Sequence, residues 1–155
     1  MIIRPAIIAD HPAIADLIQD WNFEEAAELR RPYQELKVEF VAVDGEAIVG
    51  WIAGNHKSGC WQQLAGFRDK PRSWNCSYLS LLFVTTSARR KGVARALLTA
   101  FEADATANGV TLVVILPDES DDLASVRAFY SAAGYALHEY DEQPQDPYLM
   151  TKFLH

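Results

Sequence analysis

The sequence predicts an α/β (α+β) fold formed by one domain over residues 1–155, and three observations support this prediction. A chain of 155 residues suits one hydrophobic core, because about 70% of its unfolded surface is buried at this size. Apolar runs of strand length alternate with stretches whose apolar residues recur at helical spacing. Asp44-Gly45 separates two apolar runs, which is typical of a β-hairpin. We therefore expect about seven strands and about four helices.

The first half of the chain predicts a strand, two helices and the hairpin. Asp10 suits a helix N-cap, and Pro12 suits the first turn, where a missing N–H is harmless. Pro32 ends the second helix. The elements are a strand at 2–4, a helix with the apolar stripe Ile14, Leu17, Ile18 and Trp21, a helix at 23–31, and hairpin strands at 38–43 and 48–52.

A long connection follows the hairpin, from Asn55 to Ser77. It contains three aromatic residues and no steady period, and long loops of this kind are often functional. Such aromatics more often anchor a loop to the core than line a pocket.

The second half predicts two strand–helix pairs and two closing strands. Asn108-Gly109 suits a left-handed helix end, as does Gly134 after the last helix. Asp121 or Asp122 suits the N-cap of that last helix. The elements are a strand at 78–84, a helix between 92 and 108, a strand at 110–116, a helix with Leu123, Val126, Phe129, Tyr130 and Ala133, and strands at 135–140 and 148–154.

The charge balance excludes some classes of partner. Fourteen basic against 21 acidic residues give a net charge of −7, which argues against broad nucleic-acid binding and weakly favours cationic partners.

No apolar run reaches the roughly 20 residues that cross a bilayer, so we expect no membrane partner and a cytoplasmic protein. Cys60, Cys76 and four scattered His residues lack metal-ligand spacing, so we expect free thiols and no metal.

The segment after the strand at 78–84 carries the clearest chemical signal. An apolar strand runs through Arg89, Arg90 and Lys91 into a helix that begins near Gly92. A helix N-terminus presents unpaired N–H groups and a positive dipole end, both of which suit a phosphate. Gly92 allows close approach of the backbone to a ligand, and Ala94 keeps the next turn slim. The segment is neither a P-loop nor G-x-G-x-x-G.

Two motifs in this order resemble the GNAT superfamily of acyl-CoA-dependent N-acyltransferases. Arg89-x-x-Gly92-x-Ala94 resembles the family signature [RQ]-x-x-G-x-[GA], which follows a central strand. Phe129-Tyr130-x-x-x-Gly134-Tyr135 resembles the F-Y-x-x-x-G-[FY] pattern on the last helix. Ile3-Arg4-Pro5 leading to Asp10, and the closing strand from Tyr148 to Lys152, extend the resemblance over essentially the whole chain.

The resemblance implies a GNAT-like domain with a mixed, mostly antiparallel central sheet and acetyl-CoA as co-substrate. Leu82, Phe83 and Val84 would pair with the pantetheine arm through their backbone groups, and the N–H of Val84 would face the oxyanion. The pyrophosphate would lie against the turn formed by Arg89, Arg90, Lys91, Gly92, Val93 and Ala94.

Tyr130 matches the family tyrosine that protonates the departing CoA thiolate. Two positions depart from the family pattern. Leu123 stands where many members have Asn, and Ser80 stands where many have a Glu that acts as base. The base therefore stays open among Glu24, Glu25, Glu28, His56, Asp141 and Glu142, and direct attack with water or backbone carbonyls taking the proton is an alternative. Trp21, Glu24, Glu25 and His56 are the candidates for acceptor binding.

The leading functional hypothesis is an N-acetyltransferase that transfers an acetyl group directly from acetyl-CoA to a primary amine in a ternary complex. The acceptor would be a small amine-bearing molecule or a peptide amine. One alternative is an acyl-CoA-binding regulatory module without turnover, suggested by Leu123 and Ser80. Another is an acyltransferase that uses a longer acyl-CoA, suggested by the aromatic connection from Asn55 to Ser77. Homodimers are common in the family, although the sequence identifies no interface.

Overall fold

The computed structural model describes residues 1–32, 37–56, 75–117, 122–137 and 149–154. Seven strands follow the order β1-β2-β3-β4-β5-β7-β6 in a mixed sheet. The strands β4 and β5 pair in parallel, whereas the pairs β1–β2, β2–β3, β5–β7 and β6–β7 are antiparallel. The predicted fold class and chain order of elements are thereby confirmed. The strands are β1 (Ile2–Pro5), β2 (Val38–Asp44), β3 (Ala47–Asn55), β4 (Cys76–Val84), β5 (Leu112–Ile115), β6 (Ala136–Leu137) and β7 (Met150–Phe153).

The described helices include four α-helices and two short 3-10 turns. They are η1 (Ile8–Asp10), α1 (His11–Ile18), α2 (Phe23–Leu29), η2 (Thr86–Ala88), α4 (Val93–Ala107) and α5 (Leu123–Ala132). Contacts divide the chain into two compact units, one formed by Met1–Gly54 with Leu81–Phe101 and the other by Asn55–Ser80 with Glu102–His155. Because the division falls within β4 and within α4, each of these two elements contributes to both units.

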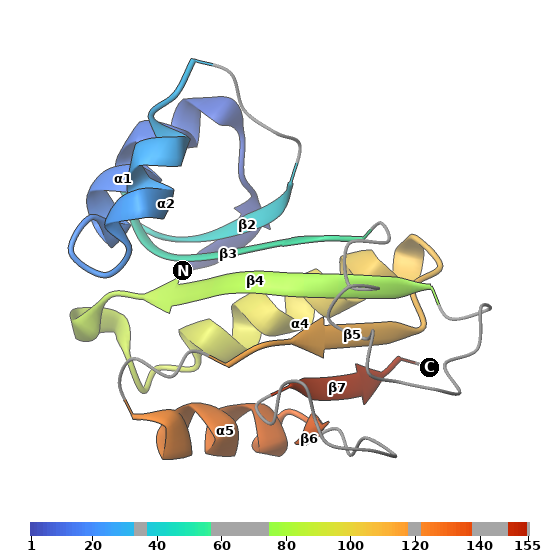
Figure 1. Cartoon of the computed structure of the whole chain (residues 1–155). Coiled ribbons are helices and arrows are strands. Elements are labelled where there is room, and N and C mark those ends of the chain that lie inside the picture. The colour runs from blue at the N-terminus through green and yellow to red at the C-terminus, as the bar shows by residue number, and fades with distance from the viewer. Residues whose placement is uncertain (33–36, 57–74, 118–121, 138–148, 155) are drawn as a thin grey trace. The chain divides into compact units, whose positions relative to one another are not determined.

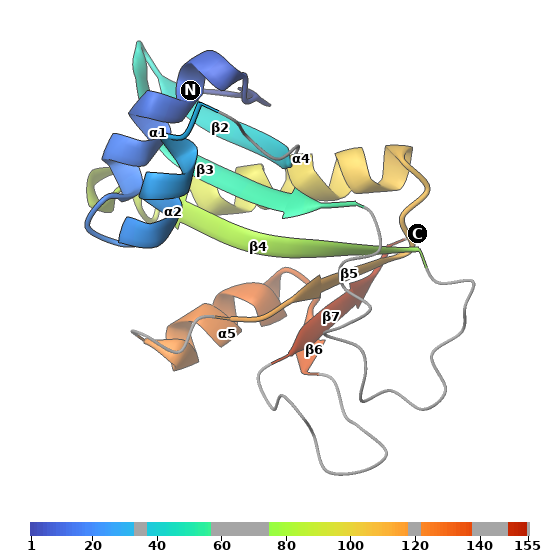
Figure 2. The same cartoon turned by 45° about the horizontal axis from the view of Figure 1, so that its top comes forward.

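The first unit contains the strands β1 to β3, the second half of β4 and the start of α4. Helices α1 and α2 lie over one face of β2 and β3 (Figures 1 and 2). The fully buried Ile14 and Ile18 of α1 contact a core that includes Val41 and Trp51 from the strands. Within the predicted apolar stripe, Ile14 and Ile18 are thus buried, whereas Leu17 and Trp21 are partly buried against the same core. The helix itself ends at Ile18, however, and Trp21 follows in a turn whose N–H donates to the Ile18 carbonyl at 3.0 Å.

Asp10 occupies the predicted N-cap position of α1, yet its carboxylate does not cap the helix. It accepts two hydrogen bonds from the Arg4 guanidinium, at 2.8 and 2.9 Å, and one from the Ile7 N–H at 2.8 Å. These contacts hold the pKa of Asp10 below its usual value, and the Arg4 hydrogen bonds are the largest cause. Asp10 therefore joins β1 to the start of α1.

The hairpin forms as predicted, with Gly45 at a φ of 63° in its turn. Its register shifts after Ala42, which pairs with Gly50, whereas Val43 pairs with Ile48. Val49 is the additional residue of this β-bulge. The carbonyl of Val49 accepts a hydrogen bond from the Thr85 N–H at 2.9 Å, which fixes the residue that follows β4.

The second unit contains the first half of β4, the strands β5 to β7, the end of α4 and helix α5. Cys76 to Leu79 pair with Leu112 to Ile115, and β4 continues for five residues beyond this pairing. All four residues of β5 are buried, as the apolar run predicted. Helix α5 begins after Asp122, whose side chain accepts from the Ser125 N–H at 3.2 Å, so Asp122, one of the two predicted candidates, is the N-cap.

Strand β4 begins two residues before the predicted start, because Cys76 and Ser77 already pair with β5. Within the described part of the chain, no helix is long and apolar enough to cross a membrane. Most of the predicted connection from Asn55 to Ser77 lies outside the described residues, as do residues 138–140 of the predicted strand at 135–140 and residue 148 of the predicted strand at 148–154.

Candidate active site

The turn between β4 and α4 has an unusual backbone. After β4 the chain makes the 3-10 turn η2 and then passes through two residues of positive φ, Arg90 at 62° and Gly92 at 77°. Arg90 is the only non-glycine residue with positive φ in the described part of the chain. That conformation costs a residue with a Cβ roughly 1–2 kcal/mol, and strain of this kind is concentrated at ligand-binding sites.

Helix α4 starts directly after this turn. Its first intrahelical hydrogen bond runs from the Ala96 N–H to the Gly92 carbonyl at 3.0 Å. The N–H groups of Val93 and Ala94 precede that bond, so the helix itself provides them with no acceptor. An ideal Cβ on Gly92 would meet no atom within 4 Å, so the space beside the turn is open. The geometry fits an anion held by backbone N–H groups.

The three basic residues of the turn differ in their surroundings. Arg90 and Lys91 are exposed, and no described residue binds their side chains. The Arg89 side chain instead turns back, and its Nε–H donates to the Val84 carbonyl at 3.0 Å. Its guanidinium carbon lies 5.9 Å from the centre of the Phe83 ring, which is within range of a cation–π contact. Two of the three side chains therefore project free positive charge.

The predicted cofactor strand residues Leu82, Phe83 and Val84 form the end of β4. Leu82 and Phe83 are partly buried and Val84 is buried. The Phe83 ring also contacts Trp21, with ring centres 5.0 Å apart. The structure therefore brings together three residues with different predicted roles. Trp21 was predicted to bind the acceptor, Phe83 to belong to the strand that pairs with the pantetheine arm, and Arg89 to belong to the pyrophosphate turn.

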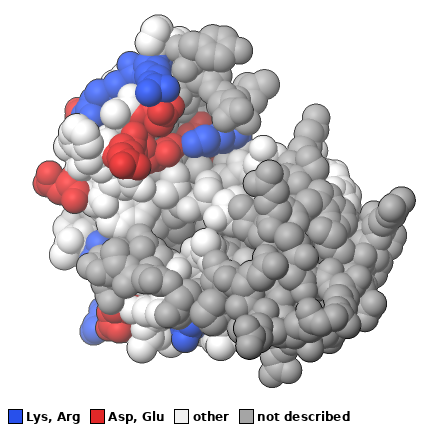
Figure 3. All heavy atoms as spheres, viewed as in Figure 1, with Lys and Arg blue, Asp and Glu red and all other residues white. Residues whose placement is uncertain are grey.

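The acidic candidates on α2 are placed differently from one another. Glu25 forms an ion pair with Lys37 at 2.7 Å, and Glu28 forms one with Arg31 at 3.0 Å. Glu24 is exposed, and no described residue binds its carboxylate. Acidic and basic side chains lie next to one another over α1 and α2, so much of the acidity there is locally balanced (Figure 3).

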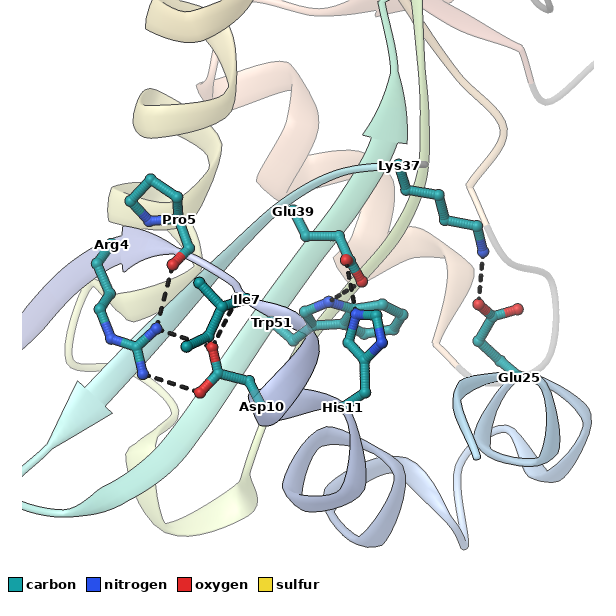
Figure 4. A network of polar contacts seen from close by, with 9 residues as sticks. All are labelled: Arg4, Pro5, Ile7, Asp10, His11, Glu25, Lys37, Glu39 and Trp51. Atoms are coloured by element: carbon teal, nitrogen blue, oxygen red, sulfur yellow. Dashed lines mark hydrogen bonds and ion pairs between the residues drawn. The ribbon is translucent and has the colours of Figure 1, made fainter. Parts of the chain in front are cut away.

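A buried polar network lies beneath α1 (Figure 4). Glu39 of β2 accepts a hydrogen bond from Trp51 Nε1 at 3.1 Å, and its other oxygen lies 2.9 Å from His11 Nε2. His11 Nδ1 is buried and has no partner among the described residues. Because Glu39 oxygens can only accept, the network favours the His11 tautomer that carries its proton on Nε2. The sequence pattern had not indicated this network, because its members are far apart in the chain.

His56 belongs to the second unit, where its ring is held on both sides. Its Nδ1 lies 2.6 Å from Ser77 Oγ and its Nε2 lies 2.8 Å from an Asp104 carboxylate oxygen. His56 and Ser77 are buried, whereas the Asp104 side chain is 39% exposed. The ring of this candidate base thus already bonds a hydroxyl and a carboxylate, which explains its burial.

Tyr130 also belongs to the second unit and is buried in α5. Its ring makes edge contacts with Phe129 and Tyr135, at centre distances of 5.1 and 5.6 Å. Burial raises the pKa of the Tyr130 phenol well above its usual value, so the hydroxyl keeps its proton at neutral pH. The protonated hydroxyl is a donor and not a base at neutral pH, and the raised pKa makes it a weaker acid than a free phenol.

The two departures from the family pattern lie within the described residues. Ser80 is exposed in β4, and Leu123 is the partly buried first residue of α5. The base candidates Asp141 and Glu142 lie outside the described residues. No group of three or more His, Cys, Asp or Glu side chains within the described ranges could hold a metal ion.

Comparisons with known proteins give one family and one fold. The model of the acetyltransferase (GNAT) family matches residues 8–135. No curated protein matches the chain significantly. Solved structures share the fold over nearly the whole chain. An acetyltransferase of the GNAT family from Staphylococcus aureus is 16% identical with a TM-score of 0.72, and the alignment covers 99% of each chain.

Two further structures carry more specific descriptions. The PaiA N-acetyltransferase from Thermoplasma acidophilum, solved in complex with coenzyme A, is 15% identical with a TM-score of 0.70, covering 99% of this chain and 98% of that one. The ribosomal-protein-S18-alanine N-acetyltransferase from Escherichia coli is 16% identical with a TM-score of 0.67, covering 98% and 92%. At these identities the likeness establishes the fold.

Proposed function

The chain belongs to the GNAT acetyltransferase family, and from this premise we propose that it is an N-acetyltransferase acting over residues 1–155 as one domain. It moves the acetyl group of acetyl-CoA directly to a primary amine while both are bound. The observation that carries the proposal is the turn between β4 and α4, where Arg90 and Gly92 adopt positive φ immediately before a helix N-terminus. The coenzyme A bound in the Thermoplasma structure supports the same cofactor class.

The chain's own residues would bind the cofactor mainly through backbone groups. The N–H groups from Arg90 through Ala94 would hold the pyrophosphate, with additional positive charge from the Arg90 and Lys91 side chains. The Arg89 N–H already donates to the Thr86 carbonyl at 3.3 Å. The end of β4, Leu82 to Val84, would pair with the pantetheine arm in the manner of an added strand. No metal is needed for this chemistry.

The reaction proceeds through attack of an uncharged amine nitrogen on the thioester carbonyl. The carbonyl oxygen becomes an oxyanion, for which the Val84 N–H is the proposed donor. The C–S bond then breaks, and the Tyr130 hydroxyl donates its proton to the departing thiolate. The proton lost by the amine goes to water, to a backbone carbonyl or to one of the acidic candidates, among which Glu24 has a free carboxylate.

The acceptor is proposed to be a small cationic amine, with a peptide amine as the alternative. The support is the net charge of −7 together with the exposed Glu24, three residues after Trp21 in the chain. Homodimers are also proposed, on the family resemblance. The decisive panel therefore contains a polyamine, an amine-bearing antibiotic and a short peptide with a free N-terminus, each assayed for release of the CoA thiol.

Calorimetric titration with acetyl-CoA tests the cofactor site without any choice of acceptor. We expect micromolar binding that is lost in Gly92→Glu, because the new carboxylate would occupy the open space where the pyrophosphate lies. The matched control is Gly109→Glu, since Gly109 has the same φ of 77° and lies just after the other end of α4. Equal binding by wild type and Gly92→Glu would remove the turn from the site.

A regulatory module that binds acyl-CoA without turnover is the second candidate. It is favoured by Ser80, which replaces the expected carboxylate on β4, and by Leu123 at the start of α5. Tight acetyl-CoA binding without CoA release on any amine of the panel would support it. Measurable release with any amine would exclude it.

A further inference from the structure

We infer that Arg89 is a positioning residue, which holds the end of β4 through the Val84 carbonyl and does not act on the cofactor by its charge. The inference rests on the proposed function, because the end of β4 is the proposed cofactor strand. It concerns what the Arg89 side chain does, which the backbone contacts proposed above leave open.

The first observation is that one peptide group is held from both sides. The Val84 carbonyl accepts from Arg89 Nε at 3.0 Å. The N–H of the same peptide group, which belongs to Thr85, donates to the Val49 carbonyl at 2.9 Å. Because a peptide group is planar, two hydrogen bonds on opposite sides fix its orientation. That peptide group joins β4 to the turn that leads to Gly92.

The second observation is that the guanidinium itself is retained over the strand. Its carbon lies 5.9 Å from the Phe83 ring centre, and the Phe83 ring contacts Trp21 in turn. Moving this group to a phosphate would break the Val84 bond and the ring contact together. It would also leave the carbonyl of a buried residue without its donor, which is unfavourable.

The third observation is that positive charge is supplied elsewhere in the turn. Arg90 and Lys91 are exposed, and no described residue binds their side chains. Their charge is available to a phosphate without breaking any contact. The hydrogen bond to Val84 is the one contribution that they do not duplicate.

Four proteins that differ only at position 89 test the effect of the hydrogen bond separately from the effect of the charge. Gln places its amide nitrogen at the same point along the side chain as Arg Nε, and it is uncharged. Lys has a methylene group at that point and keeps the charge. Met has a methyl group there and no charge. Arg, Gln, Lys and Met thus cover all combinations of donor and charge.

The first readout is hydrogen exchange of the Thr85 amide, which needs no cofactor. We expect exchange in Arg89→Lys and Arg89→Met to be faster than in wild type by about tenfold, as for loss of one hydrogen bond to a charged donor. Arg89→Gln should stay within about threefold of wild type. Equal exchange rates in the Gln, Lys and Met variants would overturn the inference, whether or not the protein binds acetyl-CoA.

The second readout is the dissociation constant of acetyl-CoA in the same four proteins. Positioning predicts that Arg89→Gln binds more tightly than Arg89→Lys, with Lys and Met both weakened by about tenfold. Action by charge predicts the reverse order, with Lys close to wild type, and that order would overturn the inference. Absence of binding in the wild type would refute the proposed function, and the exchange rates would still decide the role of Arg89.

Two controls accompany these measurements. Arg31→Gln removes one exposed positive charge from the segment that follows α2 and should alter neither readout, so it corrects for net charge. Thermal unfolding of every variant identifies general destabilisation, which would accelerate exchange throughout the core and not at Thr85 alone.

Discussion

Gly50 lies where β3 comes close to the start of α4, and replacing it with Ala tests how closely these elements pack. A Cβ built on Gly50 would lie 3.0 Å from Leu97 Cδ1, 3.2 Å from Val93 Cγ1 and 3.3 Å from the Phe83 carbonyl oxygen. Ordinary contacts of a Cβ lie at 3.4–4 Å, so all three are too short. The added methyl group therefore fits only if the Val93 and Leu97 side chains, near the start of α4, shift by a few tenths of an ångström.

The magnitude follows from two opposing effects. Crowding a packed core costs about 1–3 kcal/mol, whereas replacing Gly by Ala in an allowed conformation gains about 0.4–1 kcal/mol by restricting the unfolded chain. We expect Gly50→Ala to lower the free energy of unfolding by about 1–2 kcal/mol. Because Val93 opens the helix at the proposed pyrophosphate site, acetyl-CoA affinity should fall by several-fold as well. Urea unfolding and calorimetric titration measure the two effects.

Gly45→Ala is the matched control in the same hairpin. Gly45 has no atom within 4 Å of its ideal Cβ, but its φ of 63° makes Ala unfavourable by about 1–2 kcal/mol. This variant should be similarly destabilised and bind acetyl-CoA like the wild type. An unchanged stability of Gly50→Ala, or an equal loss of affinity in both variants, would refute the reasoning.

Three further perturbations test the remaining assignments. Tyr130→Phe should lower kcat by about 10²-fold with little change in the dissociation constant of acetyl-CoA, and an unchanged kcat would make Tyr130 structural. Asp10→Asn should destabilise the protein at neutral pH. Arg4 lowers the pKa of Asp10 in the folded protein, so its carboxylate stabilises the fold above the unfolded value of about 3.9 and this contribution is lost as the pH falls through the lower folded value. The difference between wild type and Asp10→Asn in urea unfolding should therefore disappear in strong acid, and a constant difference would contradict the assignment. Glu39→Gln should lower the free energy of unfolding by about 1–3 kcal/mol, because the amide NH₂ group would face a donor, either Trp51 Nε1 or His11 Nε2. Trp51→Phe removes one of these donors, so it should cost less free energy in the Glu39→Gln background than in the wild type.

Much of the fold could be predicted from local patterns. The alternation of apolar runs and helical stripes gave the order of the elements, and Asp44-Gly45 indicated the hairpin that forms. Boundaries were less accurate where pairing decides them. Cys76 and Ser77 look like part of a loop, yet they extend β4 because Leu112 and Val113 pair with them.

The candidate site divides in the same way. The turn from Arg89 to Ala94 is contiguous in the sequence, so its motif and its chemistry could be recognised together. The partners of single side chains could not be recognised, since they come from distant segments. Asp10 binds Arg4 instead of capping α1, and His56 bonds Ser77 and Asp104, which lie 21 and 48 residues away.

The sequence by itself therefore determined the family, the order of the elements and the phosphate-type turn, because each depends on residues close together in the chain. Only the tertiary structure decided that Arg89 bonds the Val84 carbonyl, that the Phe83 ring contacts both Arg89 and Trp21, and that Glu39 is shared by His11 and Trp51. These contacts depend on the pairing of strands and on the packing of helices over them. The sequence gives the charge and size of each residue, whereas the packing that brings distant segments together determines which residues it contacts.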